Sequence, residues 1–111
     1  MKCSHQDHGR VSVMTLSGEF TLEDVDRFQR MVADRFGASV KDLVLECENL
    51  EFVDSAGLES WLRLVEQTAE RRGQLRLVKV DATVAKVLEI TRLDKAFQVH
   101  ETVESAVRSL R

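Results

Sequence analysis

The sequence predicts an α/β fold in which a mixed, mostly parallel sheet of four to five strands packs against about four helices. Three observations lead to this prediction. Valine- and leucine-rich segments alternate with segments whose apolar residues recur at helical spacing. The connections have about two to six residues, as in βα units. No proline interrupts a helix, since the chain contains none. With 111 residues, we expect a single domain over residues 1–111.

The first half of the chain predicts a strand, a helix and a second strand. Residues 10–16 are rich in valine, methionine and threonine, which favours a strand, and Ser17-Gly18 then predicts a turn. Thr21 with Asp24 resembles a capping box, and the helix that it opens ends near Gly37. Residues 43–45 predict the second strand. The apolar stripe of the predicted helix consists of Leu22, Val25, Phe28, Val32 and Phe36.

The second half predicts three more helices and two more strands. The first of these helices ends at Gly73, its expected C-terminal cap, and residues 75–80 form a strand. Asp81 is placed to cap the next helix. A strand at residues 97–99 and a last helix near residues 102–110 follow. The stripes of the first two of these helices are Leu58, Trp61, Leu62, Val65 and Ala69, and then Val84, Val87 and Leu88.

Composition and charge are typical of a small cytosolic signalling or binding domain. Charged residues make up 32% of the chain, both signs are interspersed, and the net charge is −3. The densest cationic pair is Arg71-Arg72, which is too short to follow a nucleic-acid backbone. No apolar run approaches the roughly 20 residues that span a bilayer. Cys3 and Cys47 lie far apart, and no signal peptide precedes them, so a disulfide is not expected.

The most informative segment is Asp54-Ser55-Ala56-Gly57-Leu58, where a short loop after a buried strand meets the start of a helix. The unpaired N–H groups and the positive dipole end of a helix N-terminus favour an anion, so a phosphate on Ser55 would be tolerated there. Ser55 could instead be only an N-terminal cap. No histidine lies near Asp54 in sequence, and Val53 stands where a Gly-x-Ser-x-Gly motif needs glycine. The segment therefore indicates a switch rather than an enzyme.

These residues resemble a known family. The stretch from Leu43 through the Asp54–Leu58 signature, the upstream Leu16-Ser17-Gly18-Glu19-Phe20, and the downstream spacing of Val84, Leu88, Leu93 and Phe97 look like a STAS domain. STAS is the fold shared by bacterial anti-sigma-factor antagonists, and the resemblance covers nearly the whole chain.

The resemblance implies a partner-switching cycle. The unphosphorylated antagonist binds an anti-sigma serine kinase and frees a sigma factor, and phosphorylation of the signature serine, here Ser55, prevents that binding. A phosphatase would reverse the step. The loop from Glu48 to Val53 and the first turn of the next helix would face the partner. We expect no cofactor and no metal. The partner-binding residues that we expect are Glu19, Thr21, Phe52, Asp54, Ser55, Ala56, Gly57, Leu58 and Glu59.

Two positions depart from the family pattern. The position after the acceptor, often a second serine or threonine, is Ala56. The turn that often reads Gly-Glu-Leu-Asp is Gly18-Glu19-Phe20-Thr21, so an acidic group beside the phosphosite is missing. These departures bear on the identity of the kinase more than on the fold.

Several alternatives stay open at this point. A constitutive subunit, resembling the STAS proteins that regulate a lipid-transporting ATPase complex, would use the signature helix as a permanent docking face. A nucleotide or small anion could bind at Ser55, although Gly57 stands alone without a glycine run. Cys3, His5 and His8 lack a fourth metal ligand at a standard spacing. Trp61 and Cys47 are expected in the core. The oligomeric state, the kinase and the regulated process are left undetermined.

Overall fold

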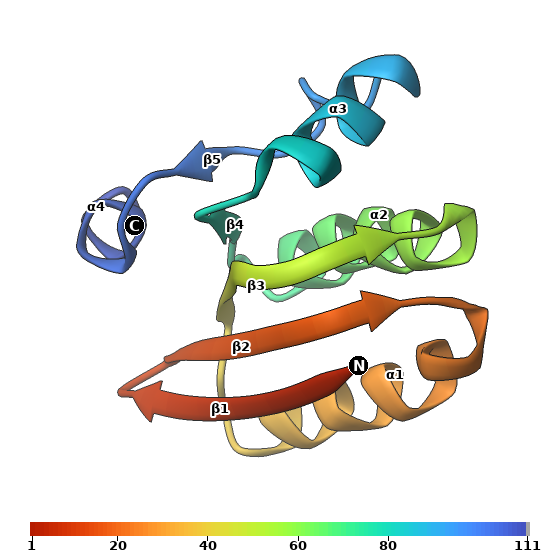
Figure 1. Cartoon of the computed structure of the whole chain (residues 1–111). Helices are drawn as coiled ribbons and strands as arrows, with labels where there is room; N and C mark the ends of the chain where they lie inside the picture. The colour runs from red at the N-terminus through yellow and green to blue at the C-terminus, as the bar shows by residue number, and fades with distance from the viewer. Residues whose placement is uncertain (111) are drawn as a thin grey trace.

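The computed structural model describes residues 1–110, which form one sheet with its helices (Figure 1). The strands are β1 (Lys2–His8), β2 (Val11–Phe20), β3 (Asp42–Val53), β4 (Leu75–Val78) and β5 (Val99–His100). The helices are α1 (Leu22–Gly37), α2 (Ser55–Glu70), α3 (Ala82–Ile90) and α4 (Val103–Arg108). The predicted α/β fold with a mixed, mostly parallel sheet is therefore confirmed, and the N-terminal segment supplies the fifth strand.

The strand order of the sheet follows the order along the chain, β1-β2-β3-β4-β5. β1 is antiparallel to β2, and every later pair is parallel. Helices α1, α2 and α3 share one hydrophobic core on one face of the sheet, with residues such as Leu45 of β3. Val44 points to the other face, where it packs with Val78 and with Ala106 of α4. Helix α4 therefore covers part of a face that the other helices leave free.

Aromatic side chains occupy the centre of the larger core. Trp61 is fully buried, with its ring centroid 6.3 Å from that of Phe20 and 6.0 Å from that of Phe97. Phe20 also contacts Phe28 of α1 at 4.9 Å between ring centroids. These tilted and edge-on arrangements are the ones that aromatic pairs favour. The expectation that Trp61 belongs to the core is confirmed.

The carboxyl halves of β2 and β3 differ from the sequence-based expectation. The turn predicted at Ser17-Gly18 is wrong, because β2 continues through it, with Gly18 at φ 86°. The loop predicted from Glu48 to Val53 is also wrong, since these residues pair with the end of β2. The pairing register shifts twice, between Thr15 and Ser17 and between Gly18 and Glu19. Such bulges insert residues without ending a strand, and they disturb the alternation that the prediction relied on.

One glycine has a role other than the predicted one. Gly73 was expected to cap α2, but the left-handed residue there is Arg72, at φ 60°. A Cβ on Gly73 would lie 1.8 Å from the carbonyl oxygen of Lys41. Gly73 is therefore required for the close approach of two backbone segments. The predicted capping groups Asp24 and Asp81 are confirmed, since Asp24 accepts the Thr21 N–H at 3.1 Å and Asp81 accepts the Val84 N–H at 2.9 Å.

Candidate functional site

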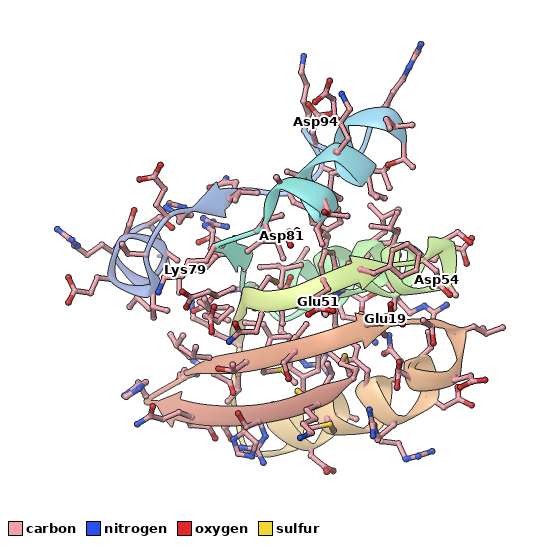
Figure 2. All side chains as sticks on the ribbon, in the orientation of Figure 1. Glu19, Glu51, Asp54, Lys79, Asp81 and Asp94 are labelled. Atoms are coloured by element: carbon pink, nitrogen blue, oxygen red, sulfur yellow. The ribbon has the colours of Figure 1, made fainter. Side chains whose placement is uncertain are left out.

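The candidate site lies where parallel strands β2 and β3 end and helices α1 and α2 begin (Figure 1). In open α/β sheets, binding sites form outside the carboxyl ends of the strands, because the loops and helix N-termini meet there. Asp54 and Glu19 are found at this end of the molecule (Figure 2). The chain returns to the same end twice, which brings residues 19–22 beside residues 52–59.

Asp54 is the residue that holds this end together. Its Oδ1 accepts the Gly57 N–H at 2.8 Å, which makes Asp54 the N-cap of α2. Its Oδ2 accepts the N–H of Leu22, the first residue of α1, at 2.9 Å. The Asp54 N–H donates to the Phe20 carbonyl oxygen at 3.1 Å. One carboxylate thus satisfies unpaired N–H groups of two helices, each of which presents a positive dipole end to it.

Ser55 is the first residue of α2 and is exposed. Since Asp54 is the N-cap, the alternative that Ser55 caps the helix is wrong. Within residues 1–110 the Ser55 hydroxyl has no hydrogen-bond partner, and the backbone holds it at the rim of the helix N-terminus. Its hydroxyl is therefore accessible to a second molecule without loss of an internal contact.

Gly57 lets the first turn of α2 lie close against the sheet. A Cβ at this position would lie 2.8 Å from Val53 Cγ1 and 3.1 Å from the Phe20 carbonyl oxygen. Its own N–H is bound by Asp54. The spacing of the Asp-Ser-x-Gly signature thus has a physical reason: the aspartate caps the helix, and the glycine permits close packing.

The other predicted partner-binding residues divide into exposed and buried groups. Glu19 and Phe52 are directly opposite each other in the β2–β3 ladder and are both exposed, Phe52 by 39%. Glu59 is exposed on α2 as well. Thr21 and Ala56 are half-buried. Gly57 is buried and Leu58 is only 4% exposed, so neither offers a side chain to a partner.

Leu22 is the residue at this end that sequence reasoning missed. The helical spacing put it on the buried stripe of α1, but its side chain is 70% exposed. Side chains at the start of a helix point back past its N-terminus, and for Leu22 this direction leads away from the core. The available signal was its position directly after the capping residue Thr21.

The two segments that form the site carry a strongly one-sided charge. Residues 11–26 and 42–62 contain ten of the 19 acidic residues and none of the 16 basic ones. Some of these carboxylates have partners from outside: Asp24 pairs with Arg27 at 3.1 Å, and Glu48 with Lys79 at 3.5 Å. Within residues 1–110, five exposed carboxylates of these two segments have no ion-pair partner, and they are Glu19, Glu23, Asp26, Glu51 and Glu59.

The cysteines and histidines do not form a site together. His5 and His8 point to opposite faces of β1, because their separation is an odd number of residues. Residues 1–110 include no group of three or more His, Cys, Asp or Glu side chains placed to hold a metal ion. Cys47 is buried as expected, and burial, with the nearby Glu46 and Asp81 charges, raises the pKa of its thiol. A buried thiol of this kind is unreactive.

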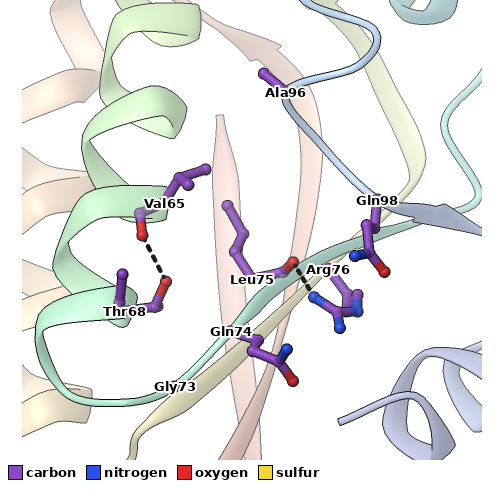
Figure 3. A pocket seen from close by; sticks show the side chains of 9 residues that line it. Val65, Thr68, Gly73, Gln74, Leu75, Arg76, Ala96 and Gln98 are labelled. Carbon is purple, nitrogen blue, oxygen red and sulfur yellow. Dashed lines mark hydrogen bonds between the residues drawn. The ribbon is translucent and has the colours of Figure 1, made fainter.

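A cleft of about 200 Å³ lies far from Ser55, between the last turns of α2 and the start of β4 (Figure 3). Arg76 lines it, but its guanidinium group is engaged: Nε donates to Ser109 Oγ at 2.8 Å and Nη1 to the Leu75 carbonyl oxygen at 3.0 Å. Thr68 Oγ1 donates to the Val65 carbonyl oxygen at 3.1 Å. These hydrogen bonds of Arg76 and Thr68 stabilise the fold. None of the residues that line the cleft belongs to the predicted site.

None of the helices over residues 1–110 has the length and apolar character needed to cross a bilayer.

Comparison with known proteins gives one consistent family. A curated relative from Thermotoga maritima, described as a candidate anti-sigma factor antagonist, is 24% identical over 102 residues, covering 91% of this chain and 90% of the relative. A Thermotoga maritima crystal structure described in the same way has a TM-score of 0.87 at 20% identity, covering 96% of this chain and 92% of that one.

Three further solved structures share the fold. The anti-sigma factor antagonist SpoIIAA has been solved unphosphorylated, with a TM-score of 0.82 at 22% identity and coverage of 96% and 93%. Its phosphorylated form, from Bacillus, gives 0.74 at 22% identity and coverage of 97% and 98%. The murine anion transporter Slc26a9 contains a region similar to 92% of this chain, with a TM-score of 0.74 at 18% identity, and that region is 18% of the transporter. The STAS domain family itself matches residues 3–106, and the chain therefore belongs to that family.

Proposed function

We propose that this protein is a phosphorylation-controlled binding module, an anti-sigma-factor antagonist with no catalysis of its own. One STAS domain over residues 1–111 acts in the cytoplasm. Its unphosphorylated form binds an anti-sigma serine kinase, phosphorylation of Ser55 ends that binding, and a phosphatase restores it. The similarity to antagonists of this class supports the general role.

The observation that carries the proposal is the state of Ser55. Its hydroxyl is exposed, free of internal hydrogen bonds to described residues, and fixed at the start of α2 by the Asp54 cap. The proposed partner surface around it consists of Glu19, Thr21, Phe52, Asp54, Ala56 and Glu59, with Gly57 and Leu58 in a packing role. A kinase can therefore reach the hydroxyl while the fold stays intact.

The phosphate acts on binding rather than on folding. It adds about −1.5 to −2 charges at neutral pH, and an unpaired charge buried in an interface costs roughly 2–5 kcal/mol. Since about 1.4 kcal/mol is a tenfold change, affinity falls by roughly 30-fold to a few thousand-fold. Within the free domain, the helix N-terminus favours the phosphate by about 0.3–1 kcal/mol. The neighbouring Asp54 carboxylate offsets this gain.

The experiment starts from the protein in its native cells. Intact mass and residue-resolved fragmentation should find one phosphate on Ser55, absent from a Ser55→Ala variant and retained in a Ser4→Ala control, which changes an exposed serine of β1. The kinases of the histidine-kinase-like ATPase type encoded in the same genome are then purified, tested for phosphorylation of Ser55, and titrated with Ser55→Ala and Ser55→Asp. Ser55→Ala should bind and Ser55→Asp should not. Absence of phosphate under every growth condition would refute the switch.

A second candidate is a constitutive assembly subunit of a transporter or another complex. The similarity of this chain to a region of an anion transporter favours it. In that role the Ser55 end would be a permanent docking face, so Ser55→Ala would leave function largely intact and Ser55 would carry no phosphate in cells. The mass measurement therefore separates the two candidates.

A further inference from the structure

The starting observation is an exposed leucine beside the phosphosite. Leu22 is 70% exposed at the first position of α1. Its N–H is bound to Asp54 Oδ2 at 2.9 Å, and Asp54 directly precedes Ser55 in the chain. The backbone of Leu22 and the backbone of Ser55 are therefore held in a fixed relation by one side chain.

We propose that Leu22 is an apolar anchor for the same kinase that recognises Ser55, and that Asp54 is the positioning residue that keeps the two in register. This inference rests on the proposed function, because it specifies the surface that the kinase contacts. It adds Leu22, the first residue of α1, to a proposed surface that already includes Glu19 and Thr21 just before this helix.

The charges around Leu22 specify the chemistry of the partner. Glu19 and Glu23 lie on either side of it in sequence, and Glu51 and Glu59 lie at the same end of the sheet. None of these exposed carboxylates is ion-paired within residues 1–110, and no lysine or arginine occurs in the two segments that form this end. Complementary surfaces associate faster and more selectively than unmatched ones. The partner therefore presents an apolar recess for Leu22 bordered by arginine or lysine side chains.

The test measures affinity for the purified kinase that phosphorylates Ser55 in vitro, with a non-hydrolysable ATP analogue present. Leu22→Ala is expected to weaken binding about tenfold or more, as truncation of a central anchor does. The matched control is Ile90→Ala on α3, because Ile90 is an apolar side chain of the same size that is also 70% exposed. It should change affinity less than about twofold. Unchanged thermal unfolding of both variants shows that the fold is intact.

A double-mutant cycle tests the role of Asp54. Introduced into the wild-type chain, Asp54→Ala should weaken binding to the kinase. Introduced into the Leu22→Ala variant, Asp54→Ala should have a much smaller effect, because the anchor that Asp54 positions is already absent. Additive effects would mean that Asp54 does not act on binding through Leu22.

The outcomes separate this inference from the proposed function. Binding that Ser55→Asp abolishes and Leu22→Ala leaves unchanged would overturn the anchor while the switch stands. A loss with Leu22→Ala but not with Ser55→Asp would support the anchor and refute the switch. If no kinase of this type phosphorylates Ser55 or binds the chain, both fail.

Discussion

The two ends of the sheet differ in charge and in the hydrogen bonds that stabilise them. At the amino ends of the strands lie Arg10, Lys41, Arg71 and Arg72, near the C-termini of α1 and α2. At the carboxyl ends of β2 and β3 lie carboxylates and the N-termini of α1 and α2, and Lys79, directly after β4, pairs with Glu48 at 3.5 Å. Helix dipoles favour both arrangements, because they stabilise cations at C-termini and anions at N-termini.

Mainly backbone contacts stabilise the amino end, together with the Asp42 carboxylate, which accepts the Gln74 N–H at 2.8 Å. The Lys41 N–H donates to the Arg10 carbonyl oxygen at 2.8 Å, and the Leu43 N–H donates to that of Gln74 at 3.0 Å. At the carboxyl end, the Asp54 carboxylate supplies the connection between the two helices. The comparison indicates that the amino end stabilises the fold, whereas the carboxyl end presents a surface whose geometry depends on a few side chains.

The largest expected effect is at the amino end. Gly73→Ala would place a Cβ 1.8 Å from the Lys41 carbonyl oxygen, so two backbone segments must move apart. We expect a loss of at least about 3 kcal/mol in the free energy of unfolding, at the upper end for overpacking. Urea denaturation measures it. Gly37→Ala is the control, because a Cβ there meets no atom within 4 Å. Similar stability for both variants would show that the amino end is not tightly packed.

A smaller effect is expected from removing the Asp54 carboxylate. Asp54→Ala should lower the free energy of unfolding by more than Asp81→Ala does, because Asp54 binds N–H groups of two helices and Asp81 binds that of Val84 in its own helix. Loss of a single cap costs about 0.5–2 kcal/mol. Hydrogen exchange should show faster exchange of the Leu22 amide in Asp54→Ala. Equal losses in the two variants would show that the bond to Leu22 contributes nothing.

The smallest expected effect is a pH dependence at the carboxyl end. Burial alone would raise the pKa of Asp24, but the Thr21 N–H, the chain's amino group and Arg27 outweigh burial and lower it. A carboxyl with a lowered folded pKa contributes stability above its unfolded pKa of 3.8. That contribution to stability is lost as the pH falls from the unfolded pKa through the lower pKa of the folded state. Asp24→Asn should therefore flatten the decline in stability below about pH 4. An unchanged pH profile would contradict this assignment.

Much of the regular part of this molecule was predictable. The amino halves of β2 and β3, the extent of α1, and the start of α3 with its Asp81 cap follow from alternation, helical spacing and capping chemistry. The bulged carboxyl halves were not predictable, since an inserted residue changes which face the following side chains occupy. The prediction consequently placed a turn at Ser17-Gly18 and a loop after Glu48 where the strands continue.

The candidate site was also predicted only in part. The signature identified Ser55 and the helix start, because the order Asp-Ser-x-Gly specifies a cap and a close approach within five residues. It did not identify Leu22, whose contact with Asp54 spans 32 residues of sequence. Periodicity assigned Leu22 to the core because it counts positions along one helix and contains no information about where that helix meets the sheet.

By itself, the sequence determined the order of strands and helices from β2 onward, the capped helix start with its serine, and the absence of lysine and arginine from residues 11–26 and 42–62. These are local properties, set by spacing, propensity and charge along the chain. Only the tertiary structure decided that those two segments meet at one end of the sheet, that Asp54 joins two helices, and that Leu22 is exposed rather than buried. The physical reason is that such contacts depend on strand register and helix packing, which are fixed when the whole core forms.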